Sequence, residues 1–257
     1  MASRFRRRLE RAFDKSVLRR WTRLARRSVR LDLGTLNTLR GRALRLRDRL
    51  DRVIRAADHR LALPHIGSNA IQRPLGTDWA HRPELWRERL ALPGAVAVES
   101  RTGIGAEATI FHDCRISELT YRQVRNGREA DLAPFGLRMD VFRFDGSFLS
   151  VVLDLPQGAA AGLGKRHILQ LDMIVEIEKP IEIFARLNIK HGPNTEQVVR
   201  EMPMGDDILS VEFDLAYTDL NEKRVEKLWI DLIFEDPEMN QIILRDVTLT
   251  RRPRTEL

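Results

Sequence analysis

A single cysteine, Cys114, is all that the sequence offers for disulfide or thiolate chemistry. One thiol cannot form an intramolecular disulfide, so the chain fits a reducing compartment such as the cytoplasm. Long apolar runs are also missing: stretches such as residues 95–98 and 173–175 fall far short of the ~20 residues that a membrane-spanning helix needs. Because Arg or Lys recurs every few residues from Arg4 to Arg30, no apolar core of a secretory signal follows the basic start. We therefore expect a cytoplasmic protein without a transmembrane segment.

Recognisable catalytic motifs are missing as well. The sequence has no glycine-rich phosphate loop, no serine nucleophile elbow and no zinc-binding helix signature. His112 and Cys114 would share one face of a strand, but two ligands do not complete a metal site. A Cys nucleophile with His112 as base is disfavoured, because strand neighbours two apart seldom meet in the required geometry. We interpret Cys114 as a core or interface residue and expect no metal and no cofactor.

Acidic residues keep a carbohydrate-active enzyme open as an alternative. A glycosidase needs two carboxylates about 5–10 Å apart across a cleft, one of them with a raised pKa. The acids at polar strand positions are Asp140, Asp154, Asp172, Glu176, Glu178, Asp214 and Asp231. We expect most of them to be solvated or paired with Arg, so the sequence predicts a non-catalytic protein.

Positive charge is concentrated at one end of the chain. Residues 1–60 hold 20 Lys and Arg against 6 Asp and Glu, a net charge of +14, whereas the other 197 residues have a net charge of −7. Within the basic segment apolar residues recur every three or four positions from Phe5 to Val29, and in a heptad pattern from Leu36 to Ala57. Asp32 or Thr35 can cap the second helix. These patterns predict an antiparallel helical hairpin over residues 1–60 that buries its two apolar stripes against each other.

This basic arm has three interpretations. It is a structural hairpin with a solvated arginine face, it docks to an anionic surface (nucleic acid or acidic lipid), or its heptad stripe binds a partner helix. No DNA-reading motif or aromatic interleaving points to sequence-specific readout. The arginines that would contact an anionic surface are Arg4, Arg7, Arg8, Arg11, Arg19, Arg23 and Arg26.

Residues 61–94 form a connecting segment with frequent Pro and Gly. The segment also contains Trp79 and Trp86, and large aromatic side chains in a loop usually anchor that loop on a neighbouring surface. We expect it to wrap the domain that follows, with a short helix whose first position is Pro83.

From residue 95 to residue 257 apolar and polar residues alternate. The alternation is clearest over residues 137–141, 169–178, 181–190, 209–215 and 228–235, with further strands expected at 95–101, 109–114, 119–124 and 242–252. Turn residues such as Asp145-Gly146 separate them. No long helical pattern intervenes, so the predicted fold class is mainly β: an antiparallel jelly-roll-like β-sandwich over residues 95–257, preceded by the N-terminal basic α-helical hairpin.

The strand spacing, together with the closing strand IILRDVTLTRR, resembles jelly rolls of the carbohydrate-binding or galactose-binding type. A family of alphaproteobacterial proteins of unknown function is similar over nearly the whole chain. The similarity lies in the segments GTDWAHRPELWR, APFGLRMDVFRFDGSFLSVVLDLP, RLNIKHGPNTEQVVREMPMG and LWIDLIFEDPEMNQIILRDVTLTRRPR. The resemblance implies a bacterial cytoplasmic setting and supplies no catalytic residues.

The residues most like a site alternate along one predicted strand and its end. Side chains two apart share a face, and Arg and Asn beside an aromatic ring suit sugar hydroxyls, carboxylates or phosphate. The set is Glu182, Phe184, Arg186, Asn188, Lys190 and His191. The alternative is an ordinary solvent-facing strand whose Phe184 packs under another segment. The loop at residues 191–196 is either the rim of a site or a simple hairpin. An aromatic content of only 6% counts against a broad stacking surface for polysaccharide.

These observations predict a non-catalytic binding or adaptor protein. Its β-sandwich would recognise a protein or glycan-like ligand, while the basic arm docks to an anionic polymer or to the inner membrane surface. One alternative is a nucleic-acid- or membrane-surface-associated factor that acts through the arm, and the other is the carbohydrate-active enzyme.

Overall fold

The computed structural model describes residues 2–62, 71–115, 118–128, 131–205 and 208–254, and within the N-terminal helices it describes the side chains of residues 15–54 and 57. The chain divides into two compact units, Met1–Val53 and Ile54–Leu257. Over the described residues, no helix has the combination of length and apolar character that crossing a bilayer requires.

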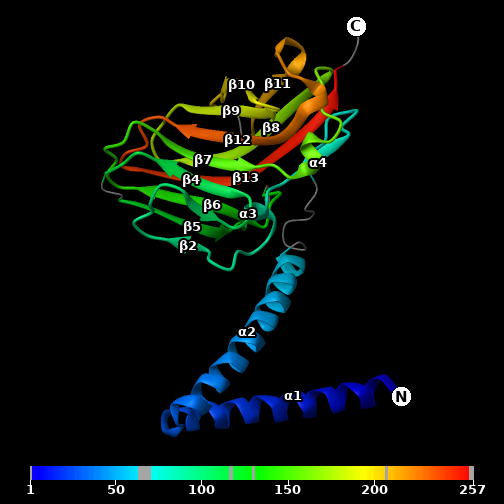
Figure 1. The fold of residues 1–257 in the computed structure, drawn as a ribbon, viewed down its shortest axis with the longest axis vertical. Helices are drawn as coiled ribbons and strands as arrows, with labels where there is room; N and C mark the ends of the chain where they lie inside the picture. Colours follow the sequence, from blue (N-terminus) through cyan, green and yellow to red (C-terminus); the bar gives the residue numbers. More distant parts are fainter. Residues whose placement is uncertain (1, 63–70, 116–117, 129–130, 206–207, 255–257) are drawn as a thin grey trace. The chain divides into compact units, whose positions relative to one another are not determined.

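Two helices joined by a tight turn make up the first unit (Figure 1). α1 (Ala2–Arg27) leads into one turn of 3-10 helix, η1 (Ser28–Arg30), and α2 (Leu33–Ala62) starts directly after Asp32. Asp32 caps α2, because its Oδ1 accepts a hydrogen bond from the Thr35 amide at 2.9 Å. The same hydrogen bond holds the pKa of Asp32 below its ordinary value. The two predicted helices and the Asp32 cap are confirmed.

The two apolar stripes do not pack against each other as predicted. No described side chain between residues 15 and 54 is buried, and Leu18 and Val53 are 68% and 66% exposed. Figure 1 shows α1 and α2 running apart from the turn. Arginines flank the stripe on both helices, so close pairing along their length would bring like charges together. The expected mutual burial is therefore wrong for the described part of this unit.

The connecting segment is anchored on the second unit. It contributes β1 (Trp79–His81), which pairs with the end of β13 (Asn240–Pro253), and α3 (Glu84–Arg87). Trp86 is fully buried, and its Nε1 donates to the Leu244 carbonyl at 2.9 Å. The expected anchoring by a tryptophan is confirmed for Trp86. Pro83 takes the N-cap position of α3 rather than the first helical position.

Two sheets form the sandwich of the second unit, and every described strand pair is antiparallel (Figure 1). The seven-stranded sheet has the order β11-β8-β13-β6-β5-β2 with β1 beside β13, and the six-stranded sheet has the order β10-β9-β12-β7-β4-β3. The strands are β2 (Gly94–Ala95), β3 (Thr102–Ile104), β4 (Ala108–His112), β5 (Leu119–Arg125), β6 (Phe135–Val141), β7 (Leu149–Asp154), β8 (His167–Ile177), β9 (Ile183–His191), β10 (Asn194–Glu201), β11 (Leu209–Asp214) and β12 (Val225–Phe234). Short helices α4 (Gln157–Ala160), η3 (Leu215–Tyr217) and η4 (Glu222–Arg224) lie in the loops. The predicted mainly-β antiparallel fold is confirmed.

The core lies between the sheets, where the alternating apolar positions meet. In β8 the side chains of Leu169, Leu171 and Met173 are fully buried, and their polar neighbours face outward. Phe213 of β11 and Phe234 of β12 are among the largest buried side chains. Each fully buried apolar side chain of this size contributes about 1.5–3 kcal/mol. Burial along the predicted period of two is therefore what stabilises the sandwich.

Three segments differ from the strand prediction. Residues 95–101 form no continuous strand, because β2 ends at Ala95 and both Ala97 and Arg101 have positive φ. β7 is a central strand that the alternation did not indicate. β10 is an edge strand, and it completes a hairpin with β9 in which His191 pairs with Asn194. The hairpin interpretation of residues 191–196 is thus confirmed.

Candidate functional site

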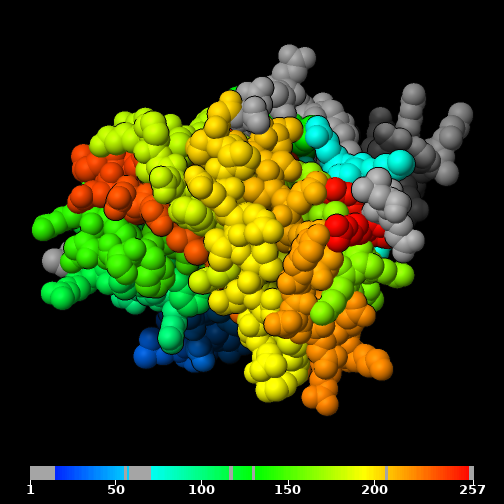
Figure 2. Space-filling view, turned by 90° about the horizontal axis from the view of Figure 1, so that it is seen from above, coloured from blue at the N-terminus to red at the C-terminus, as the bar shows by residue number. Residues whose placement is uncertain are grey.

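The side chains of β9 that do not point into the core lie on the outer face of the six-stranded sheet. Because the odd-numbered residues from Ile183 to Ile189 are buried in the core, the even-numbered ones from Phe184 to Lys190 point to the other face. β10, in yellow in Figure 2, is the edge strand beside β9, and most of its residues are exposed. The other neighbour of β9 is β12, so three strands build this face around β9.

A connected set of polar side chains crosses these three strands. Arg186 donates from Nε to Oδ2 of Asp231 on β12 at 2.7 Å, and its Nη2 lies 2.6 Å from the same oxygen. Asn188 donates to that oxygen at 3.1 Å and accepts from Nε2 of Gln197 on β10 at 2.8 Å. Asn188 and Asp231 are almost fully buried beneath this network. The hydrogen bonds therefore fix the orientation of the amide, carboxylate and guanidinium groups relative to one another.

An aromatic ring lies in the same row. Trp229 of β12 is in register with Asn188 on one side and with Asp154 of β7 on the other, and it is half-buried. The ammonium group of Lys227 lies 5.7 Å from the centre of the Trp229 ring and 2.7 Å from Oδ1 of Asp154. The outer face thus combines an indole ring with an amide on one flank and a carboxylate–ammonium pair on the other.

The structure brings together only some of the predicted site residues. Arg186 and Asn188 join through Asp231, as just described. Phe184 lies one row along the face and half-buried, in register with Ile233 of β12. Lys190 is exposed and pairs with Glu226 at 3.0 Å, and Glu182 is exposed just before β9 begins. These two charged residues lie at opposite ends of the strand, outside the connected set.

His191 does not belong to this face, which corrects its inclusion in the predicted set. It continues the odd-numbered, inward positions of β9 and is 5% exposed. Its Nδ1 accepts from the Asn221 amide at 3.4 Å, and its Nε2 has no hydrogen-bond partner among the described residues. Lys190 and His191 are consecutive residues of β9, so their side chains point to opposite faces of the sheet.

Trp229 and Gln197 join the candidate site in the structure, and the sequence prediction did not include them. Trp229 and Asp231 occupy polar positions of the predicted strand at 228–235, so a tryptophan at an outward position was the available signal. Gln197 lies on β10, for which no strand was expected. Its position opposite Asn188 follows from the hairpin register alone.

Three groups with possible catalytic chemistry, His112, Cys114 and Asp246, lie away from the connected set. His112 donates from Nε2 to the Val98 carbonyl and accepts at Nδ1 from the Cys114 amide at 3.2 Å, so its ring nitrogens serve the backbone rather than the thiol. Burial raises the pKa of the Cys114 thiol, which disfavours a thiolate. Burial also raises the pKa of Asp246, although Arg82 binds both of its oxygens at 2.8 Å. His112 occupies a buried position of β4, and Asp246 lies on β13 of the seven-stranded sheet.

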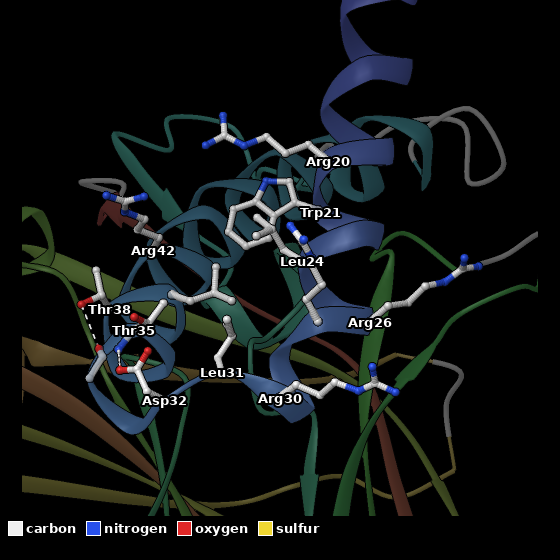
Figure 3. A pocket seen from close by; sticks show the side chains of 13 residues that line it. Arg20, Trp21, Leu24, Arg26, Arg30, Leu31, Asp32, Thr35, Thr38 and Arg42 are labelled. Atoms are coloured by element: carbon white, nitrogen blue, oxygen red, sulfur yellow. Dashed lines mark hydrogen bonds between the residues drawn. The ribbon is translucent and has the colours of Figure 1, made fainter.

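A second candidate site lies in the first unit, in a hollow of about 1200 Å³ between α1, the turn and α2. Its apolar lining comes from Trp21, Leu24, Leu31 and Leu39, and its cationic lining from Arg20, Arg26, Arg27, Arg30 and Arg42. Figure 3 shows Trp21 and Leu24 toward the space between the helices and Arg20 beside Trp21, whereas the guanidinium groups of Arg26 and Arg30 extend away on the outer side of α1. The hollow therefore pairs an apolar floor with a cationic rim.

Of the seven predicted arm arginines, Arg19, Arg23 and Arg26 are exposed on α1. Arg4, Arg7, Arg8 and Arg11 have their backbone in α1, and their side chains lie outside the described part of the chain. Sequence reasoning did not include Arg20, Arg30 or Arg42, which reach the hollow from three different elements.

Several solved structures are similar to the β-sandwich. The family 11 carbohydrate-binding module from Clostridium thermocellum, in complex with a β-1,3-1,4-mixed-linked tetrasaccharide, has 12% identity and a TM-score of 0.39, covering 65% of this chain and 99% of that one. The C-terminal family 22 carbohydrate-binding module of Clostridium thermocellum Xyn10B has 8% identity and a TM-score of 0.37, covering 73% and 99%.

A third similar structure is the enzymatically active domain of tailspike protein 4 from bacteriophage CBA120, with 8% identity and a TM-score of 0.39. The matched part covers 56% of this chain and only 19% of the tailspike chain. No curated protein matches the sequence. A family model, in contrast, matches residues 1–257, and the chain belongs to that family, the Family of unknown function (DUF6478).

Proposed function

We propose that the protein is a non-catalytic binding protein whose six-stranded sheet recognises a glycan-like ligand on its outer face, while the basic arm attaches the protein to an anionic surface. The observation that carries the first part is the position of Trp229 between Asn188 on one flank and Asp154 on the other. We keep the predicted cytoplasmic location as part of this proposal.

The chemistry of this face suits a polyhydroxylated ring. The apolar face of a sugar stacks on an indole, and its hydroxyl groups bind planar amides, guanidinium groups and carboxylates at the ring edge. Gln197 and Arg186 present their polar groups next to the buried Asn188 and Asp231, which hold them by hydrogen bonds of 2.8 Å and 2.7 Å. Because these groups are already oriented, binding costs less conformational entropy.

Binding is favoured over catalysis because the acids on this face are paired. Asp231 is bound by Arg186 and Asn188, and Asp154 pairs with Lys227 at 2.7 Å. Glycoside hydrolysis needs one carboxylic acid whose pKa is raised so that it can donate a proton. Among the carboxylates of the described residues, Asp246 has a raised pKa. However, Asp246 lies on the seven-stranded sheet, and Arg82 donates hydrogen bonds to both of its carboxylate oxygens.

The proposal is tested by applying the full-length protein to a glycan array and measuring the dissociation constant of the best ligand by calorimetry. We expect Trp229→Ala to weaken binding at least tenfold, which corresponds to about 1.4 kcal/mol of lost stacking. Trp229→Phe should retain most of the affinity, because it keeps an aromatic ring at the same position.

Tyr217→Ala is the matched control. Tyr217 is an exposed aromatic residue on η3, and Arg254 lies over its ring at 5.6 Å, as Lys227 lies near the ring of Trp229. The control variant should bind like the wild type. An array without ligands, or a ligand whose affinity is unchanged in Trp229→Ala, would contradict the proposal.

A further inference from the structure

The first unit exposes more apolar surface than a solvated structural hairpin explains. Large apolar side chains stand in solvent along both helices and at the turn between them. Their exposed fractions are 68% for Leu18, 89% for Val29, 84% for Leu33, 51% for Leu50 and 66% for Val53. Contiguous apolar surface rimmed by charged residues marks an interaction site rather than an ordinary protein surface.

The same unit is strongly cationic. Residues 15–53 hold 13 Lys and Arg against 3 Asp and Glu. Two of those acids are occupied within the unit: Asp32 caps α2 through the Thr35 amide, and Asp48 pairs with Arg52 at 2.7 Å. The arginines around the hollow, such as Arg20, Arg26 and Arg42, are exposed and available to an anionic partner. The occupant must therefore carry negative charge.

We propose that this unit binds the surface of an anionic lipid bilayer, with the apolar stripes of α1 and α2 in the boundary between headgroups and acyl chains and the arginines on lipid phosphates. The inference deepens the proposed function, because it names the anionic surface to which the arm attaches. A helix with an apolar face and a Lys/Arg-rich polar face lies in the plane of such an interface.

The exposed apolar side chains favour an anionic bilayer over a nucleic acid or a second copy of the arm as the occupant of this surface. A nucleic acid would neutralise the arginines but leave Leu18, Val29 and Val53 in water. A second copy of the arm would cover the apolar side chains but place one net charge of +14 beside another. An anionic bilayer satisfies both features at once. Trp21 fits this arrangement too, since indole rings favour the level of the lipid headgroups, and Figure 3 shows it beside Leu24 at the apolar floor of the hollow.

The test measures co-sedimentation of the full-length protein with two kinds of vesicle: phosphatidylglycerol mixed equally with phosphatidylcholine, and phosphatidylcholine alone. Retention on a short double-stranded DNA is measured in parallel. We expect binding to the anionic vesicles and none to phosphatidylcholine. Replacing Leu18, Val29 and Val53 together by Asn keeps the charge and should weaken vesicle binding at least tenfold, with DNA retention unchanged.

The matched control replaces Ser16 and Thr22, exposed polar residues on α1 that do not line the hollow, by Asn. It introduces the same side chain without removing apolar surface, so it should bind vesicles like the wild type. Changing Arg19, Arg23 and Arg26 to Gln should weaken binding to both vesicles and DNA.

Each other outcome is decisive. If the triple Asn variant binds anionic vesicles like the wild type, or if DNA is retained while vesicles are not, the bilayer inference is wrong and the arm still docks to an anionic polymer. If neither vesicles nor DNA bind, the attachment role in the proposed function is wrong as well.

Discussion

The Arg82–Asp246 and Arg186–Asp231 pairs differ in how much of the arginine side chain is exposed to solvent. In the Arg82–Asp246 pair the side chains are 2% and 6% exposed, so the pair is sealed and fastens the connecting segment to β13. In the Arg186–Asp231 pair the carboxylate is 5% exposed but the guanidinium is 37% exposed. The first pair is therefore structural, and the second presents an oriented cationic edge to the outer face.

The buried pair gives a prediction for stability. Arg82→Met leaves Asp246 buried without its cation, so the free energy of unfolding at pH 7 should fall by about 3–5 kcal/mol. Burial already raises the pKa of Asp246, and loss of Arg82 raises it further. A carboxyl group with a raised pKa in the folded state contributes stability at low pH that is lost as the pH rises through that pKa. The difference between the variant and the wild type should therefore shrink from pH 7 to about pH 5 in urea unfolding curves.

Arg138→Met is the control for this comparison. Arg138 pairs with Asp140 at 2.7 Å on the same sheet, but the two side chains are only partly buried. Its loss should cost less than about 1 kcal/mol, with little change between the two pH values. Equal losses in the two variants would show that the Arg82 pair is not the buried anchor described here.

At the scale of elements, the β9–β10 hairpin fixes which polar side chains meet. Its two-residue turn begins with Gly192, whose φ of +63° is open to glycine and strained for other residues. With this turn His191 pairs with Asn194, and the same register places Gln197 opposite Asn188. A slip of one residue would move every outward side chain of β10 to the other face.

Gly192→Ala should therefore lower the free energy of unfolding by about 1–2 kcal/mol, because alanine is strained at this φ. It should also weaken binding of the ligand, since Gln197 would no longer support Asn188 in the same register. Thermal unfolding and calorimetry measure the two effects. Gly103→Ala on the edge strand β3, where an added Cβ meets no atom within 4 Å, is the control and should leave ligand binding unchanged. Intact binding in Gly192→Ala would contradict the role of the register.

The start of α2 depends on the Asp32 cap in a similar way. Asp32→Ala removes the acceptor of the Thr35 amide, so helicity measured by circular dichroism should fall. Hydrogen bonding from Thr35 lowers the pKa of Asp32, so the carboxylate's contribution to stability is present above its ordinary pKa and is lost as the pH falls through the lowered value. Asn37→Ala, on the exposed surface of α2, is the control and should not reduce helicity. A cap variant with unchanged helicity would show that α2 does not need this hydrogen bond.

At the scale of the whole molecule, charge distinguishes the two proposed interactions. In the proposed function the basic arm attracts an anionic surface, and this attraction should weaken with salt because mobile ions screen exposed charges. A glycan-like ligand without charge binds through stacking and hydrogen bonds, which salt affects little. Raising the salt concentration from about 0.05 M to about 0.5 M should thus release the protein from anionic vesicles while its affinity for the glycan stays within about twofold. Salt sensitivity of both interactions would mean that the two units do not act separately.

The sandwich was predictable where one face of a strand is buried and the other is not. β8 and β9 show that pattern directly, since alternate residues from Leu169 and from Ile183 are buried. The strand β7 was not predicted because Leu149, Ser150 and Val151 are buried in succession, as happens in a central strand covered on both faces. The strand β10 was not predicted for the opposite reason: most residues of this edge strand are exposed, so its sequence shows no alternation of apolar and polar residues.

The candidate site was predictable only in part for a related reason. Alternation along β9 identified Arg186 and Asn188, but the groups they meet come from other strands. Asp231 and Trp229 reach them through the register of β12, and Gln197 through the register of β10. Register depends on turns and on packing between strands, which a single strand's period does not contain. The hairpin packing of α1 and α2 was overestimated because the heptad pattern shows apolar spacing but not the repulsion of the arginines beside it.

The central claim is that a glycan-like ligand sits on Trp229, and the indole signals of the full-length protein test it most directly. The four tryptophans lie in three parts of the chain: Trp21 in the arm, Trp79 and Trp86 in the connecting segment, and Trp229 on the outer face. After assignment with Trp→Phe variants, a ¹H–¹⁵N spectrum is recorded while the best ligand from the array is added. We predict that the Trp229 indole signal shifts and that the signal of the fully buried Trp86 does not. A shift of Trp79 or Trp21 with Trp229 unmoved would contradict the claim.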